Sequence, residues 1–275
     1  MYQFTKYFLV AISISLMSLV INASPQDATG IIRVDKEHLA GMDLGKFAPY
    51  LPETGDLIAT DLAFYTSKDE LFSIGIWESK AGSMLDPGLE YDELMYIVSG
   101  SMVMTGPSGN TETYKVGDGV IAPQGWKGTL TIPEGGVRML WAAYTHKNNN
   151  DSLKTVRMDQ ERLSGKNLGE YAPYEPEMGT LVSHGHDYFY SADEAFGAGV
   201  WESKPGIITY KNLEYDELMY VLDGSMIMTS EDGKIGTYGK GEGLILPKGW
   251  SGTLEVPDGG VRKIWVSYMA GIKGG

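Results

Sequence analysis

Residues 93–100 read Glu-Leu-Met-Tyr-Ile-Val-Ser-Gly, and seventeen positions after this glycine, residues 117–126 read Gly-Asp-Gly-Val-Ile-Ala-Pro-Gln-Gly-Trp. Both stretches are rich in residues that favour strands, and both end at glycine-containing turns, which is typical of strands that fold back. The two stretches return 124 positions later, as residues 217–224 and 241–250. A repeat of this length is too long for a solenoid unit and matches a small domain. The sequence therefore predicts two copies of one fold in tandem.

The rest of each copy is also strand-like. Short runs of Val, Ile, Tyr, Trp, Met and Thr, such as residues 137–144, alternate with Gly, Pro, Asn and Asp. The only helical signals are two short segments, residues 35–41 and 159–165, each with an Asp at its start and a Gly at its end. We therefore predict an all-β protein. A linker rich in Asn places the boundary near residue 151, giving domains at 24–150 and 151–275.

The spacing of the two stretches resembles that of the cupin family. The first motif of that family is Glu, six residues and Gly, and its second is Gly, five residues and Pro-x-Gly; both copies meet both spacings. The Tyr-Asp lead-in and the Trp after the second motif resemble the branch that includes ureidoglycine aminohydrolase and the ethanolamine-utilisation cupin. The resemblance implies two tandem double-stranded β-helix (jelly-roll) domains. It does not fix an activity, because this fold hosts many functions.

The resemblance also implies a divalent metal, held by a His-x-His pair and a Glu from the first motif and a His from the second. In the first copy, the His-x-His slots fall on Asp86 and Gly88, or on Pro87 and Leu89, and the second-motif slot falls on Gly128. In the second copy, they fall on Tyr210 and Asn212, or on Lys211 and Leu213, and on Gly252. No histidine occupies any of these positions. A single carboxylate does not hold a transition metal tightly. We therefore predict no cofactor and no typical metal site. The alternative is one divalent metal in the second domain, on His184, His186 and Glu217.

Strand alternation predicts which residues face the barrel interior. If Glu93 points inward, so do Tyr91 and Met95. The predicted ligand-binding residues are Tyr91, Glu93, Met95 and Trp126 in the first domain, and Tyr215, Glu217, Met219 and Trp250 in the second.

Each interior Glu has three readings. Burial would raise its pKa, which makes Glu93 and Glu217 candidate catalytic acids or bases. Each could instead accept a hydrogen bond from a ligand's amine or hydroxyl, or only pin the barrel. On the binding hypothesis, Glu217→Gln is expected to abolish binding with little loss of stability. His38 and His146 are expected on the surface.

Composition restricts the partners. The chain has 36 acidic and 22 basic residues, a formal net charge of −14, and no cysteine. Such a surface repels nucleic acid and anionic lipid. It suits either simple solubility or attraction of a cationic ligand. Disulfides, thiolate chemistry and attachment through a lipidated cysteine are excluded.

Residues 1–23 resemble a secretory signal, with a single Lys6 before an apolar run that is short for a membrane span. We therefore expect a periplasmic or secreted protein, with no membrane association once the signal is removed. The preferred function is an exported bicupin that binds a small polar molecule. The alternatives are a metal-dependent aminohydrolase- or isomerase-like enzyme using the second domain, and a structural or assembly protein. Homo-oligomerisation is left open.

Overall fold

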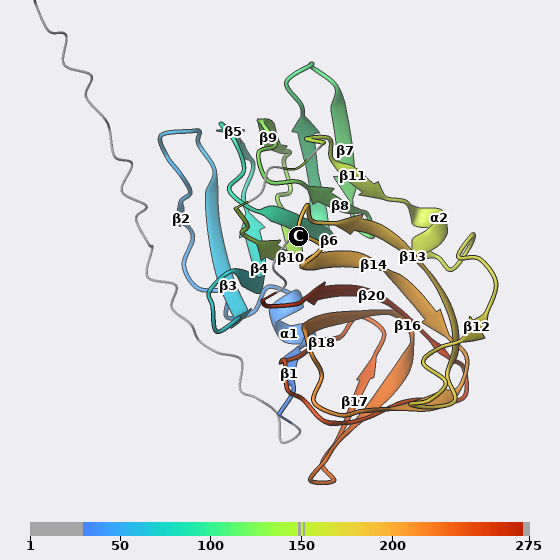
Figure 1. Ribbon diagram of the computed structural model, residues 1–275. Coiled ribbons are helices and arrows are strands. Elements are labelled where there is room, and N and C mark those ends of the chain that lie inside the picture. The colour runs from blue at the N-terminus through green and yellow to red at the C-terminus, as the bar shows by residue number, and fades with distance from the viewer. Residues whose placement is uncertain (1–29, 148–149, 151, 272–275) are drawn as a thin grey trace, which may run out of the picture.

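The computed structural model describes residues 30–147, 150 and 152–271. It contains two antiparallel sheets of ten strands each, and each sheet folds into a barrel that forms one half of the molecule (Figure 1). The all-β prediction is confirmed. The predicted signal segment lies outside the described residues.

The two halves have the same order of elements. The first half contains β2 (Ala48–Pro49), β3 (Ile58–Thr66), β4 (Phe72–Ser79), β5 (Gly82–Asp86), β6 (Asp92–Thr105), β7 (Thr111–Lys115), β8 (Gly119–Ala122), β9 (Gly128–Ile132) and β10 (Val137–Tyr144). The second half contains β12 (Ala172–Pro173), β13 (Val182–Tyr190), β14 (Phe196–Ser203), β15 (Gly206–Tyr210), β16 (Asp216–Ser230), β17 (Ile235–Gly239), β18 (Gly243–Leu246), β19 (Gly252–Val256) and β20 (Val261–Tyr268). Two one-turn helices, α1 (Lys36–Leu39) and α2 (Gln160–Leu163), are capped by Asp35 and Asp159 as the sequence predicted.

The halves exchange their first strands. β1 (Ile32–Val34) pairs with β18 of the second half, with Ile32 opposite Ile245. β11 (Val156–Met158), which opens the second repeat, pairs with β8 of the first half, with Val156 opposite Ile121. In Figure 1 the blue β1 accordingly lies with the orange and red strands. Each sheet is therefore completed by a strand from the other repeat.

Strand alternation divides the apolar side chains between three cores. In β6, Met95 and Ile97 point into the first barrel, whereas Leu94 and Tyr96 point to a central core between the barrels. β16 repeats this pattern, so that Tyr220 meets Tyr96 across the interface with ring centroids 5.2 Å apart. The central core draws buried residues from both halves, which explains why the barrels pack back to back.

Two polar contacts across this interface form a reciprocal pair. The Tyr144 hydroxyl donates to Asp193 over 2.8 Å, and the equivalent Tyr268 hydroxyl donates to Asp69 over 2.6 Å. The tyrosine rings themselves lie 5.0 Å apart. Both contacts join one half to the other, as the pseudo-symmetry of a duplicated chain predicts.

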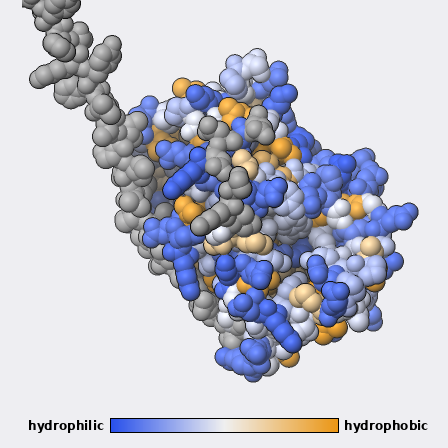
Figure 2. Space-filling view, viewed as in Figure 1, coloured by the Kyte–Doolittle hydropathy of each residue, from blue (hydrophilic) through white to orange (hydrophobic). Residues whose placement is uncertain are grey.

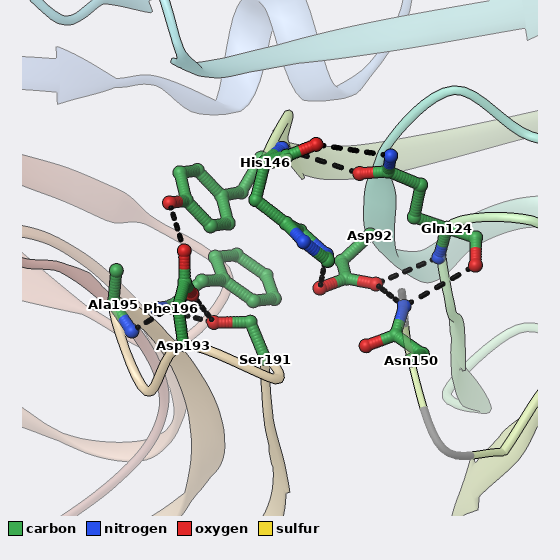
Figure 3. A network of polar contacts seen from close by, with 9 residues as sticks. Asp92, Gln124, His146, Asn150, Ser191, Asp193, Ala195 and Phe196 are labelled. Carbon is green, nitrogen blue, oxygen red and sulfur yellow. Dashed lines mark hydrogen bonds and ion pairs between the residues drawn. The ribbon is translucent and has the colours of Figure 1, made fainter. Parts of the chain in front are cut away.

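His146 breaks the pseudo-symmetry and corrects a prediction. We expected it on the surface, but its side chain is fully buried, with Nε2 3.0 Å from a carboxylate oxygen of Asp92 (Figure 3). The backbone N–H of Gln124 and the side-chain amide of Asn150 also donate to Asp92. Asp92 has no solvent exposure, and a buried carboxylate needs such donors. His146 therefore helps to satisfy a buried acid.

The face of the molecule in Figure 2 is mainly hydrophilic with scattered hydrophobic residues, as the composition predicted. Within the described residues, no helix has the length and apolar character needed to span a membrane.

Candidate functional site

The first barrel encloses a cavity of about 250 Å³. Its walls combine aromatic rings, methionines and carboxylates, whereas its mouth is formed by the exposed residues Leu51, Glu70 and Leu71. The principal wall residues are Tyr50, Asp61, Trp77, Met84, Asp86, Tyr91, Glu93, Met95, Met139 and Trp141. A small, largely apolar cavity with a few convergent polar groups is the usual form of a small-molecule site.

Strand register places these side chains in rows across the inner face. Asp61, Trp77 and Met139 are direct neighbours on β3, β4 and β10. Trp141 lies in the next row, opposite Gly75, where a side chain on that residue would collide with the indole ring. The glycine therefore allows Trp141 to lie against the sheet, where its indole N–H donates to Asp61 over 3.0 Å.

Four carboxyl groups line this cavity, and three of them, on Glu93, Asp61 and Asp86, have a raised pKa. Burial, reinforced by the charges of Asp61 and Asp86, raises the pKa of Glu93 to about 8. Burial raises the pKa of Asp61 to about 6 against the opposing effect of the Trp141 hydrogen bond, and raises that of Asp86. Asp61 is an exposed residue that lines the cavity.

The first cavity has no cation of its own. No Lys, Arg or His is among the described residues that line it. Within the described part of the chain, the Glu93 carboxyl group also forms no ion pair or hydrogen bond, although Tyr91 is close enough for the Glu93 charge to raise the pKa of the tyrosine. The cavity therefore gathers acidic groups whose charge, once they ionise, is not offset by any Lys, Arg or His among its described lining residues.

The second barrel has a cavity of similar volume, about 250 Å³, but a different charge arrangement. The Lys263 ammonium lies 2.8 Å from Glu217, and both side chains are almost fully buried. The same ammonium lies 5.1 Å from the centre of the Trp201 ring. Lys263 occupies the position of Met139 in the repeat, while Tyr210 and Gly185 occupy those of Asp86 and Asp61. The second barrel thus neutralises its own carboxylate.

The family model of the EutQ-like cupin domain matches the chain twice, at residues 66–139 and 190–265, and the two matches together cover more than half of the chain. The protein is a bicupin of the EutQ-like cupin family. The cupin resemblance and the tandem jelly-roll fold are thereby confirmed.

Solved structures support the same fold. A protein of unknown function from Pseudomonas syringae pv. tomato, of the DUF861 family, superimposes with a TM-score of 0.63 at 18% identity, covering 74% of this chain and 85% of its own. A cupin 2 conserved barrel domain protein from Leptotrichia buccalis superimposes with a TM-score of 0.56 at 14% identity, covering 82% of this chain and 98% of its own. A protein from Pseudomonas aeruginosa described as a putative glyoxylate-induced protein superimposes with a TM-score of 0.56 at 14% identity, covering 80% of this chain and 82% of its own. No curated protein sequence matches the bicupin.

The structure brings together part of the predicted binding set. Tyr91, Glu93 and Met95 line the first cavity, and Tyr215 and Glu217 line the second. The other three predicted residues lie in the barrel cores: Met219 is fully buried, and Trp126 and Trp250 pack over Gly128 and Gly252.

Sequence reasoning missed Asp61, Asp86 and Lys263. Asp86 was considered only as an empty histidine slot. Lys263 could have been found by comparing the repeats position by position, because a charged residue replaces Met139 on an otherwise apolar inward face. Both cavities therefore contain charged groups that motif spacing did not indicate.

The bicupin's residues do not fit the metal site that its family resemblance implies. A side chain at position 128, the histidine slot of the second motif, would collide with the Trp126 ring. In the second barrel, His184 stacks on Tyr171 and contacts the Gly169 carbonyl. Asp187 lines the cavity, and alternation in β13 places His184 and His186 on the other face of the strand. Among the described residues, no group of three or more His, Asp or Glu side chains could hold a metal ion. We therefore assign no metal-dependent step to either barrel.

The raised pKa of Glu93 predicts a pH-dependent stability. Between its ordinary value near 4.5 and about 8, the folded bicupin retains a proton that the unfolded chain releases, so the free energy of unfolding falls as pH rises. The loss approaches about 1.4 kcal/mol per pH unit within this window and ends above it. We expect Glu93→Gln to remove this term, so that the variant gains stability relative to wild type between pH 5 and pH 8.5. Urea denaturation across this range measures the difference, and parallel stability curves for the two proteins would contradict the assignment.

Proposed function

We propose that this bicupin is an exported protein that binds a small polar molecule in its first barrel. One observation carries the proposal: an accessible cavity of about 250 Å³ places Glu93 and two further carboxylates among aromatic walls with no cation to offset them. Isolated negative charge in such a place costs folding free energy, and a ligand that satisfies it would recover that cost. The export part of the proposal rests on the character of residues 1–23.

The cavity also favours binding over a purely structural role. A barrel that serves only as a spacer gains stability when side chains fill it, because tight packing stabilises a core. Here the unfilled volume coincides with the carboxylates. The second barrel is a weaker candidate, since Glu217 already has a partner in Lys263.

A fragment screen with cavity-filling variants tests the proposal. Ala143 in the first barrel and Ser267 in the second are equivalent positions, and both line their cavities. We expect ligand-observed NMR on a library of small polar fragments to reveal compounds that bind the wild type and Ser267→Phe but not Ala143→Phe. Circular dichroism establishes that both variants are folded. A library without binders, or binders indifferent to Ala143→Phe, would refute the proposal.

A second candidate is acid–base catalysis by Glu93. A carboxyl group with a pKa of about 8 can hold or release a proton near neutral pH, which is the property a general acid or base requires. For a compound found in the screen, this reading predicts turnover by wild type, with Glu93→Gln retaining binding but losing the reaction. Turnover that survives Glu93→Gln would exclude this role.

A further inference from the structure

The second barrel shows how an ammonium group fits against the part of the cavity wall that is identical in the two repeats. Its Glu217 and Trp201 occupy the same repeat positions as Glu93 and Trp77 in the first barrel. Between them lies the Lys263 ammonium, 2.8 Å from the carboxylate and 5.1 Å from the ring centre. A carboxylate and an aromatic face together are a strong environment for a desolvated ammonium.

The first barrel retains this environment but lacks the lysine. Met139 stands in place of Lys263, so Glu93 and the face of Trp77 have no cation between them. Asp61 and Asp86, which the second barrel replaces with Gly185 and Tyr210, add further negative charge. The first barrel is thus complementary to an ammonium group, which the second barrel supplies from its own Lys263.

We propose that the first barrel binds a small molecule with a primary alkylammonium group, held on Glu93 against Trp77 as Lys263 is held on Glu217 against Trp201. The inference rests on the proposed function and adds the ligand's chemical class. The second barrel is its self-occupied counterpart, in which a tethered side chain takes the ligand's place. The exposed acidic surface of the chain attracts the same class of ligand.

The lysine side chain suggests the probes. Its four carbons and amine correspond to n-butylamine, for which 1-butanol is a neutral match and butyrate an anionic one. At pH 8.5 the amine is cationic and Glu93 is largely ionised. We expect calorimetry to show n-butylamine binding wild type at one site, at least tenfold more tightly than either control, because a charge-assisted contact contributes more than about 1.4 kcal/mol.

Exchanging the residues at positions 139 and 263 tests the location of the site. We expect Met139→Lys to weaken n-butylamine binding at least tenfold, because the new ammonium would occupy Glu93. Met139→Leu, which changes shape without adding charge, should keep the preference for the amine over the alcohol. Lys263→Met should create a second amine site in the other barrel. Circular dichroism checks that each variant is folded. If Met139→Lys does not fold, the location of the amine site is tested by Lys263→Met alone.

The outcomes separate the two proposals. Equal binding of amine and alcohol, or amine binding unaffected by a folded Met139→Lys, would overturn the ammonium inference. If none of the three probes binds while the fragment screen yields compounds that Ala143→Phe excludes, the inference fails and the proposed function stands. If the screen is also empty, both fail.

Discussion

Glu217→Gln is expected to lower the free energy of unfolding by roughly 2–4 kcal/mol, because it leaves the buried Lys263 ammonium without its anionic partner. Both side chains of the pair are almost fully inaccessible to solvent, so water compensates poorly for the lost contact. This expectation replaces the one drawn from sequence, which treated Glu217 as a ligand-binding residue that could be neutralised with little loss of stability. Urea denaturation at pH 8.5 measures the change.

The equivalent replacement in the first barrel is the matched control. Glu93→Gln removes an unpaired carboxylate and is therefore expected to leave stability unchanged or to raise it at the same pH. The double variant Glu217→Gln/Lys263→Met should recover most of the loss, since it also removes the stranded ammonium and restores the residue found at position 139. Equal effects of the two Gln variants would show that the ion pair does not distinguish the barrels.

Separating the chain at the linker is expected to abolish monomeric folding of both halves. A fragment of residues 24–150 lacks β11, which completes its sheet, and a fragment of residues 151–275 lacks β1. Both would also expose their side of the central core, including Tyr96 or Tyr220. We expect the isolated fragments to be unfolded or self-associated, and to assemble into a one-to-one complex when expressed together.

Size-exclusion chromatography with light scattering, combined with circular dichroism, measures this assembly. A useful control is the uncut chain with a protease site inserted in the linker, because cleavage after folding should leave the halves associated. A fragment that is monomeric and unfolds cooperatively by itself would contradict the interlocked arrangement.

Much of the fold followed from local sequence features. The repeat and its strand-like segments predicted two all-β domains, and the resemblance of the paired motif spacings to the cupin family implied that these domains are jelly rolls. Alternation in residues 93–100 predicted which residues share a face with Glu93, because alternation depends only on short-range geometry. The caps at Asp35 and Asp159 were predicted for the same reason. Strand exchange was not predicted, because the partners of β1 and β11 depend on how the two barrels dock.

The candidate site was predicted only in part. Tyr91, Glu93 and Met95 follow from alternation along one strand, whereas Asp61 and Asp86 reach the cavity from β3 and β5 through pairing registers that the sequence does not display. His146 was misplaced because it follows the last strand of its barrel in a polar linker. Only the buried Asp92 explains why it turns inward.

Strand exchange also has a consequence for synthesis. As the chain leaves the ribosome, β1 emerges long before its partner β18, from which most of both repeats separates it. The first barrel likewise waits for β11, so its sheet can close only after the start of the second repeat has emerged. Such long-range pairing slows folding and prolongs the time that strand edges are unprotected.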